Sequence, residues 1–162
     1  MILRACAYGA IAGAAGTTVL DAATYADMAI RCRPASSLPQ RMVEELARRA
    51  GVTELAKPQE ELSESERNRR IGLGALLGYV DGIGSGVLFG VLRTTAMKNV
   101  SWCWAGIGLG MLTMVLSEGT ATALGQTDPR AWALSDWIAD IVPRCLYGWT
   151  TAISFDSLVD GS

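Results

Sequence analysis

The chain has 162 residues, half of them apolar, with a net charge of −2 and no histidine. Nothing in this balance favours nucleic-acid binding, and four scattered cysteines without histidine offer no ligand set for zinc or haem. Charged residues crowd between positions 31 and 70, which hold nine Lys or Arg and seven Asp or Glu. Long apolar segments make up most of the remainder. We therefore expect an all-α integral membrane protein with no metal and no cofactor.

Four apolar segments are each long enough to cross the ~30 Å hydrocarbon core of a bilayer as a helix. They are expected to cover residues 5–30, 67–93, 100–124 and 129–156. Tryptophans near the start of the third and fourth segments fit an interfacial aromatic belt. A buried helix of a soluble protein is the alternative for the first segment, which is rich in Ala and Gly. The prediction is one membrane domain, residues 1–162, folded as a four-transmembrane-helix bundle.

The connections between these segments predict the orientation, because Lys and Arg are enriched in cytoplasmic loops. The first and third connections together carry ten Lys or Arg, against three in the N-terminal tail and the second connection. We expect a multi-pass plasma-membrane protein with a cytoplasmic first loop and both termini outside.

The first connection is expected to contain a short amphipathic helix over residues 38–50. Ser37 and Gln40 form a capping-box pattern around Pro39, and Gly51 is a typical stop. The apolar face is expected to hold Leu38, Met42, Val43, Leu46 and Ala50, opposite the charged Arg41, Glu44, Glu45, Arg48 and Arg49. That face needs cover, which the membrane surface, the end of the bundle or another protein would supply.

Capping residues predict two further helix starts. Ser63 and Glu66 form a second capping box, so the second span should begin as a helix before it enters the bilayer. Asp128 and Pro129 are expected to supply the N-cap and the first residue of the fourth helix.

Glycines recur at every fourth position of the second span: Gly74, Gly78, Gly82, Gly86 and Gly90. Helices in lipid associate by close packing over small residues, so this stripe should face another helix. The first span has Gly9 and Gly13 at the same spacing, and the third has Gly106 and Gly110. Packing within the bundle is the simpler interpretation, and an interface with a second copy or a partner subunit is the alternative.

Charged side chains also fall inside the predicted spans: Asp21, Asp81, Glu118, Asp140 and Arg144. Each costs at least ~2.5–3.5 kcal/mol near the centre of a bilayer, so they should face the bundle interior and one another as a polar layer. Asp140 precedes Arg144 by one helical turn, with Pro143 between them. Four acids and one base require protonation, a bound cation or water. The layer is either a hydrogen-bond network that specifies assembly or a proton or cation site.

A catalytic centre is not indicated. A serine or cysteine nucleophile would lack histidine as a base, and both lysines lie outside the spans. The neighbouring acids Asp136 and Asp140 have no GxGD companion motif. We expect a protein that is not an enzyme.

Two blocks of sequence resemble a family of small actinobacterial integral membrane proteins. They are GTTVLDAATYADMAIRCRPASSLPQ, residues 16–40, and GQTDPRAWALSDWIADIVPRCLYGWTTA, residues 125–152. The resemblance is loose between them. It implies a four-helix plasma-membrane protein and brings no activity or ligand with it. This chain has Arg144 where the family usually has histidine.

These patterns favour a non-enzymatic accessory or structural subunit of a membrane protein complex, which packs through glycine-rich helix faces and docks through its cytoplasmic loop. The alternative is a small transporter or channel-like protein that moves protons, a cation or a small solute past the acidic layer. Membrane lipid and other membrane subunits, or a second copy, are the expected partners.

Overall fold

The computed structural model describes residues 2–161, and these form five α-helices, three short 3₁₀ helices and no strand. The α-helices are α1 (Ile2–Arg31), α2 (Leu38–Ala50), α3 (Glu64–Thr95), α4 (Trp102–Ala123) and α5 (Leu134–Asp160). The 3₁₀ helices are η1 (Thr53–Leu55), η2 (Gln59–Glu61) and η3 (Pro129–Ala131). The expected all-α class is confirmed. Within residues 2–161, two helices, α1 and α3, are long and apolar enough to cross a membrane.

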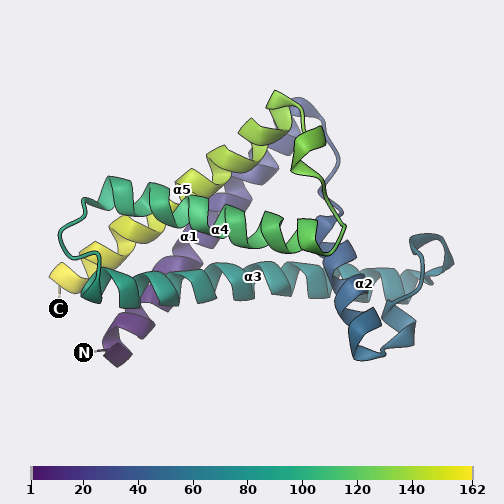
Figure 1. Ribbon diagram of the computed structural model, residues 1–162, viewed down its shortest axis with the longest axis horizontal. Helices are drawn as coiled ribbons and strands as arrows, with labels where there is room; N and C mark the ends of the chain where they lie inside the picture. Colours follow the sequence, from purple (N-terminus) through teal and green to yellow (C-terminus); the bar gives the residue numbers. More distant parts are fainter. Residues whose placement is uncertain (1, 162) are drawn as a thin grey trace.

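The four long helices form a bundle with both chain ends on one side (Figure 1). The termini and the turn between α3 and α4 lie at one end, whereas α2 and the connection from α4 to α5 lie at the other. Helix α1 packs against α3 and α5, and α5 also packs against α4, but α3 and α4 scarcely touch. Helix α2 lies across the end of α3. One side of α3 is therefore left without a helix packed on it.

Helices α1 and α3 cross at glycines whose backbones are in contact. A Cβ atom added to Gly86 would lie 2.5 Å from the Cα of Gly13 and 2.5 Å from the carbonyl oxygen of Gly9. Gly82 lies against Thr17 in the same way, and Gly90 lies against the backbone of Ala5. At Gly86 no side chain larger than hydrogen fits between these helices, which explains why glycines meet at the closest point of the crossing.

The remaining glycines of the stripe behave differently from one another. Gly74 lies against Pro39 at the start of α2, where a Cβ would come within 3.0 Å of the Pro39 Cβ. A Cβ on Gly78 would meet nothing within 4 Å. The stripe therefore packs on α1, on α2 and, through Gly90 and Phe155, on α5, whereas a Cβ at Gly78 has no neighbour.

Glycine also holds α4 against α5. Gly106 lies against Gly148, and a Cβ on Gly110 would lie 2.5 Å from the carbonyl oxygen of Arg144. Between these contacts and the α1–α3 crossing, Phe89 and Phe155 pack edge to face with ring centroids 5.9 Å apart. The core is small because the helix backbones fill most of the space that side chains occupy in a soluble bundle.

The start of α2 differs from the prediction. Ser37 precedes the helix, but no capping box forms, because its hydroxyl accepts a 2.8 Å hydrogen bond from the guanidinium of Arg41. The hydroxyl of Ser36 accepts from the Leu38 backbone N–H instead. The helix ends at Gly51, with a φ of 74°, as predicted.

The buried side of α2 is rotated from the predicted one. Val43 and Ala47 are buried, but Leu46 is 46% exposed. Glu45, expected on the exposed face, is buried and forms ion pairs with Arg48 and Arg49. The hydrophobic periodicity of α2 predicts an apolar stripe, but the packing of α2 on α3 decides which edge of that stripe is buried.

The other two predicted starts had different outcomes. The capping box at the start of α3 is present: the Ser63 hydroxyl accepts from the Glu66 N–H, and the Glu66 carboxylate accepts from the Ser63 N–H. Asp128 and Pro129 begin η3 and not the long helix. Helix α5 begins at Leu134, where the Asp136 carboxylate accepts a 3.0 Å hydrogen bond from the N–H of Ala133. The prediction that this helix starts at 129 was wrong, because Asp128 caps a single 3₁₀ turn.

Candidate functional site

Three of the five charged residues expected in the polar layer come together between α4 and α5. The Nε of Arg144 donates to Asp140 at 2.9 Å, and its Nη2 donates to Glu118 at 3.4 Å. The side chain of Arg144 is 14% exposed and that of Glu118 is 10% exposed. This cluster, called here the arginine cluster, is therefore largely enclosed by the two helices.

The close packing of α4 and α5 brings the arginine cluster together. The backbone of α4 at Gly110 touches the backbone of Arg144. Glu118 follows Gly110 by about two helical turns, so it lies beside the stretch of α5 that precedes Arg144. Asp140 lies one turn before Arg144 on α5 and receives the other arm of the guanidinium.

The arginine cluster is not fully satisfied. The second carboxylate oxygen of Glu118, Oε2, and the hydroxyl of Ser117 are buried and have no hydrogen-bond partner. A buried polar atom without a hydrogen-bond partner is unfavourable. A proton on the Glu118 carboxylate, or a water molecule beside it, would therefore be stabilised.

Asp81 faces the same region from α3 without joining the arginine cluster. Arg144 acts on Asp81 through its charge, but no hydrogen bond or ion pair joins Asp81 to another described residue. The Asp81 side chain is exposed on the surface of α3. Asp81, Glu118 and Asp140 together face one guanidinium, so acids outnumber bases here.

Asp21 lies apart from the other four. It is on α1, where its carboxylate meets the hydroxyl of Tyr79 on α3. Tyr79 and Asp81 are two positions apart, so their side chains leave α3 on nearly opposite sides. The sequence predicted one polar layer to which all four helices contribute, whereas the structure places Asp21 on a different side of α3 from the arginine cluster.

A second buried arginine, which the sequence analysis missed, orders the region between α1 and α3. Arg70 is 1% exposed although it lies at the start of a predicted span. Its Nη1 donates to Glu44 of α2 at 3.1 Å, and its Nη2 donates to the carbonyl oxygens of Leu55 at 2.8 Å and Lys57 at 2.7 Å. We call this set the Arg70 clamp. No short sequence pattern indicates it, because the acceptors are mostly backbone carbonyls of a loop.

An apolar groove of about 320 Å³ adjoins the Arg70 clamp. It lies between α2 and α3 and is lined only by apolar side chains, among them Leu46, Ala50, Leu73 and Leu77. Leu46 and Leu73 are both exposed there. The unburied apolar edge of α2 thus continues onto the exposed apolar side of α3.

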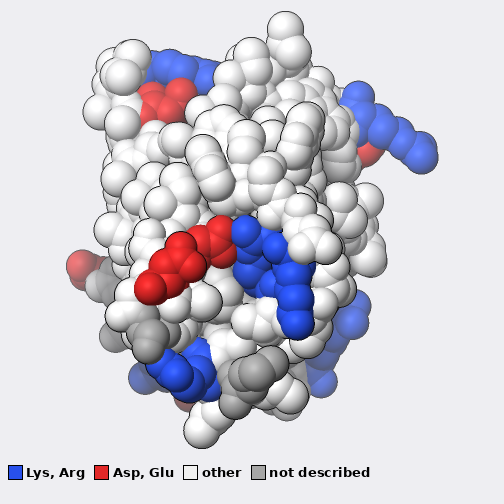
Figure 2. Space-filling model, turned by 90° about the vertical axis from the view of Figure 1, so that its left-hand side faces the viewer, with Lys and Arg blue, Asp and Glu red and all other residues white. Residues whose placement is uncertain are grey.

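A third arginine closes the opposite end of the bundle. Arg93 binds Asp156 through two hydrogen bonds, of 2.9 and 2.6 Å, and also donates to the carbonyl oxygen of Met97. This joins the end of α3, the following turn and α5. Figure 2 faces this end and shows acidic and basic side chains gathered in its middle, surrounded largely by uncharged ones.

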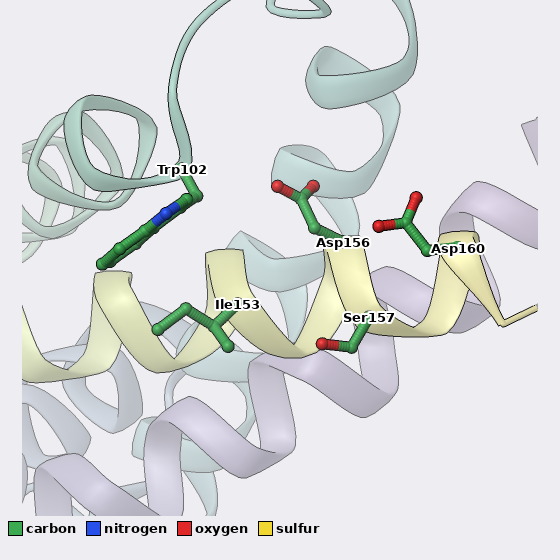
Figure 3. A pocket seen from close by; sticks show the side chains of 5 residues that line it. All are labelled: Trp102, Ile153, Asp156, Ser157 and Asp160. Atoms are coloured by element: carbon green, nitrogen blue, oxygen red, sulfur yellow. The ribbon is translucent and has the colours of Figure 1, made fainter.

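A shallow depression of about 310 Å³ lies beside this ion pair. Figure 3 shows Asp156 and Asp160 one turn apart on α5 with their carboxylates on the same side, and the ring of Trp102 lying above the same helix near Ile153. The Asp156 carboxylate is already bound by Arg93. The depression is therefore a poorer candidate for a functional site than the arginine cluster.

The chain was compared with protein-family models, curated proteins and solved structures, and no match was found. The resemblance of residues 16–40 and 125–152 to an actinobacterial membrane family stays a prediction.

Proposed function

We propose that all four long helices cross the plasma membrane, with α2 at its cytoplasmic surface and both termini outside. Two observations support this arrangement. Helices α4 and α5 pack on each other, and α5 packs on α1, so insertion of α1 brings its neighbours with it. Helix α4, the shortest of the four long helices, has 22 residues. At ~1.5 Å per residue it is about 33 Å long, which is enough to cross the hydrocarbon core.

Exposed apolar side chains on α4 and α5 support the same arrangement. Val115 is 67% exposed, Ile138 52% and Val142 50%. Exposing clustered apolar side chains to water is unfavourable in free energy, and contact with lipid would remove this cost.

Within this membrane, we propose that the chain is a non-enzymatic accessory subunit that holds another membrane protein. The Arg70 clamp carries this proposal. A connection that only joined two spans would gain nothing from a buried arginine that fixes α2, η1 and the carbonyl of Lys57 against α3. Ordering such a segment costs conformational entropy, and a surface ordered in advance binds a partner more tightly. The exposed edge of α2, with Leu46 at its centre, is the surface that the clamp holds in place.

Photo-crosslinking from α2 tests the accessory role. A photoreactive amino acid replaces Leu46 in the protein expressed at its native level, and crosslinked products are separated by size. The proposal predicts one crosslinked product of fixed size, which should be lost in Arg70→Met. The product should be retained in the control variant Arg69→Met, because the Arg69 side chain is exposed. Products that contain lipid alone, or an unchanged product in Arg70→Met, would contradict the accessory role.

The arginine cluster favours transport as a second candidate function. Glu118 has one unpartnered, buried carboxylate oxygen, and excess negative charge surrounds Arg144. Such a carboxyl group is suited to take up and release a proton. Purified protein in liposomes with a pH-sensitive dye inside should then carry a proton flux that Glu118→Gln abolishes. Equal flux in protein-containing and empty liposomes would remove this candidate.

A further inference from the structure

We propose that the exposed side of α3 around Asp81 binds a transmembrane helix of a partner subunit, and that this helix brings a basic side chain to Asp81. The proposal rests on the accessory role proposed above and names the chemistry of the partner. It begins from a carboxylate, that of Asp81, which no described residue pairs with through a hydrogen bond or an ion pair.

Asp81 lies near the middle of α3, which has 32 residues. Its side chain is exposed, and it has no hydrogen bond or ion pair with any described residue. If α3 crosses the membrane, this carboxylate lies beside the arginine cluster and is also open to the hydrocarbon core, where a charged group is strongly unfavourable unless it is paired. A group in this position requires a partner from outside the chain.

The chain cannot supply that partner from its own bases. Arg144 already donates to Asp140 and to Glu118. The other arginines with several bonds, Arg70 and Arg93, are held at the two ends of α3 by their own acceptors. A basic side chain on another helix would pair with Asp81 and reduce the excess negative charge that it shares with the arginine cluster.

The surface around Asp81 has the form of a helix-packing seam. Leu77, Asp81, Gly84 and Leu88 are all exposed and follow one another at intervals of four, three and four residues. This is the spacing at which one helix meets another along its length. A Cβ added to Gly84 would meet nothing within 4 Å. Small residues in such a seam permit a close approach of a second helix.

The partner is expected to be a different protein and not a second copy of this chain. A symmetric pair that used this seam would bring two copies of Asp81 together, because the same patch meets itself across a twofold axis. Two carboxylates in that position would repel each other, whereas a basic side chain would be attracted. The negative charge of Asp81 therefore favours a basic helix of another protein over a second copy of this chain.

The test measures binding of designed helices to the purified full-length protein in nanodiscs. One probe is a fluorescent polyleucine transmembrane peptide with a single central lysine, and the other has leucine at that position. We expect energy transfer to show about tenfold tighter binding of the lysine peptide. Asp81→Asn should remove this preference, and Asp160→Asn, which changes an exposed acid at the end of α5, should leave it intact.

A second variant tests the seam without changing any charge. Gly84→Leu enlarges a seam residue that is exposed and has no neighbour within 4 Å of an added Cβ, so the bundle should fold as before, but the lysine peptide should bind more weakly. Equal binding of the two peptides, or a lysine preference that persists in Asp81→Asn, would overturn the proposal. Energy transfer between two labelled copies of the protein that Gly84→Leu abolishes would also overturn it and assign the seam to a dimer. The Leu46 crosslinking experiment probes the edge of α2 and does not depend on the charge of Asp81, so the accessory role can fail or stand separately.

Discussion

Arg70 and Glu44 are 26 positions apart in the sequence and are joined by a 3.1 Å hydrogen bond between Nη1 and Oε2, which fastens α2 to the start of α3. The same guanidinium holds two loop carbonyls, so one side chain fixes most of the connection between α1 and α3. This arrangement makes the connection a surface with a defined shape.

Loss of the Arg70 clamp should loosen this connection. In Arg70→Met the carbonyls of Leu55 and Lys57 lose their donor and Glu44 loses its cation, which we expect to cost ~3 kcal/mol. Hydrogen exchange measured by mass spectrometry should then be faster over residues 51–63. Arg69→Met is the matched control, since its exposed side chain forms only one 3.4 Å bond with Glu54. Equal exchange in both variants would show that other contacts order the connection.

The start of α3 should weaken in acid. Hydrogen bonds from Lys57 and from Ser63 lower the pKa of Glu66 from its ordinary value of 4.5 to about 2. Because the folded pKa is the lower one, the stabilisation is complete above about pH 4.5 and is lost as the pH falls toward 2. The carboxyl ¹³C shift of Glu66 should titrate with a midpoint near 2.

The matched variants for this prediction change neighbouring acids. Glu66→Gln should remove the acid dependence of hydrogen exchange in the first turn of α3, whereas Glu64→Gln should preserve it, since Glu64 takes no part in the cap. A Glu66 titration midpoint at the ordinary value would contradict the hydrogen bond from Lys57.

The α1–α3 crossing should tolerate no added methyl group. Gly86→Ala places a Cβ 2.5 Å from the Gly13 Cα, so the helices must separate, at a cost of roughly 2–3 kcal/mol in the free energy of unfolding. Gly72→Ala is the control, because a Cβ there meets nothing within 4 Å. It should be neutral or stabilising by up to ~1 kcal/mol through higher helix propensity. Unfolding in detergent with increasing dodecyl sulfate measures both, and equal stability of the two variants would refute the close contact.

Breaking the arginine cluster should destabilise the α4–α5 pair. Arg144→Met leaves Glu118 and Asp140 near each other without a cation, which we expect to cost ~3–5 kcal/mol. The double variant Arg144→Met with Glu118→Gln should recover part of this loss, because the more buried of the two acids is then neutral. Strictly additive effects in the same unfolding assay would show that Arg144 and Glu118 do not interact.

The sequence predicted the parts of this fold that depend on local pattern. The all-α class follows from long apolar segments, the cap at Ser63 and Glu66 from residue types three apart, and the end of α2 from Gly51. The glycine spacing indicated that α3 packs closely on a neighbour, but it could not tell that Gly78 would be the position without one. That depends on where α1 diverges from α3 and α2 begins.

The polar layer shows why the site was harder to predict. Position along a helix predicts only the approximate depth of a side chain, and on that basis Asp21 and Asp81 are expected in the same polar layer. The direction of a side chain around the helix axis depends on how the helices pack, and Asp21 meets Tyr79 on the other side of α3. The Arg70 clamp could not be predicted at all, because loop carbonyls carry no sequence signal.

Cysteine labelling in intact cells tests most directly whether the four long helices cross the membrane. The four native cysteines, all unpaired, are replaced by serine, and single cysteines are introduced at Leu3, Asn99, Ser65 and Ala131, which are all exposed. A membrane-impermeant maleimide should label Leu3→Cys and Asn99→Cys in intact cells, and Ser65→Cys and Ala131→Cys only after permeabilisation. Labelling of Asn99→Cys and Ser65→Cys from the same side would contradict the account, because α3 would then not cross the membrane.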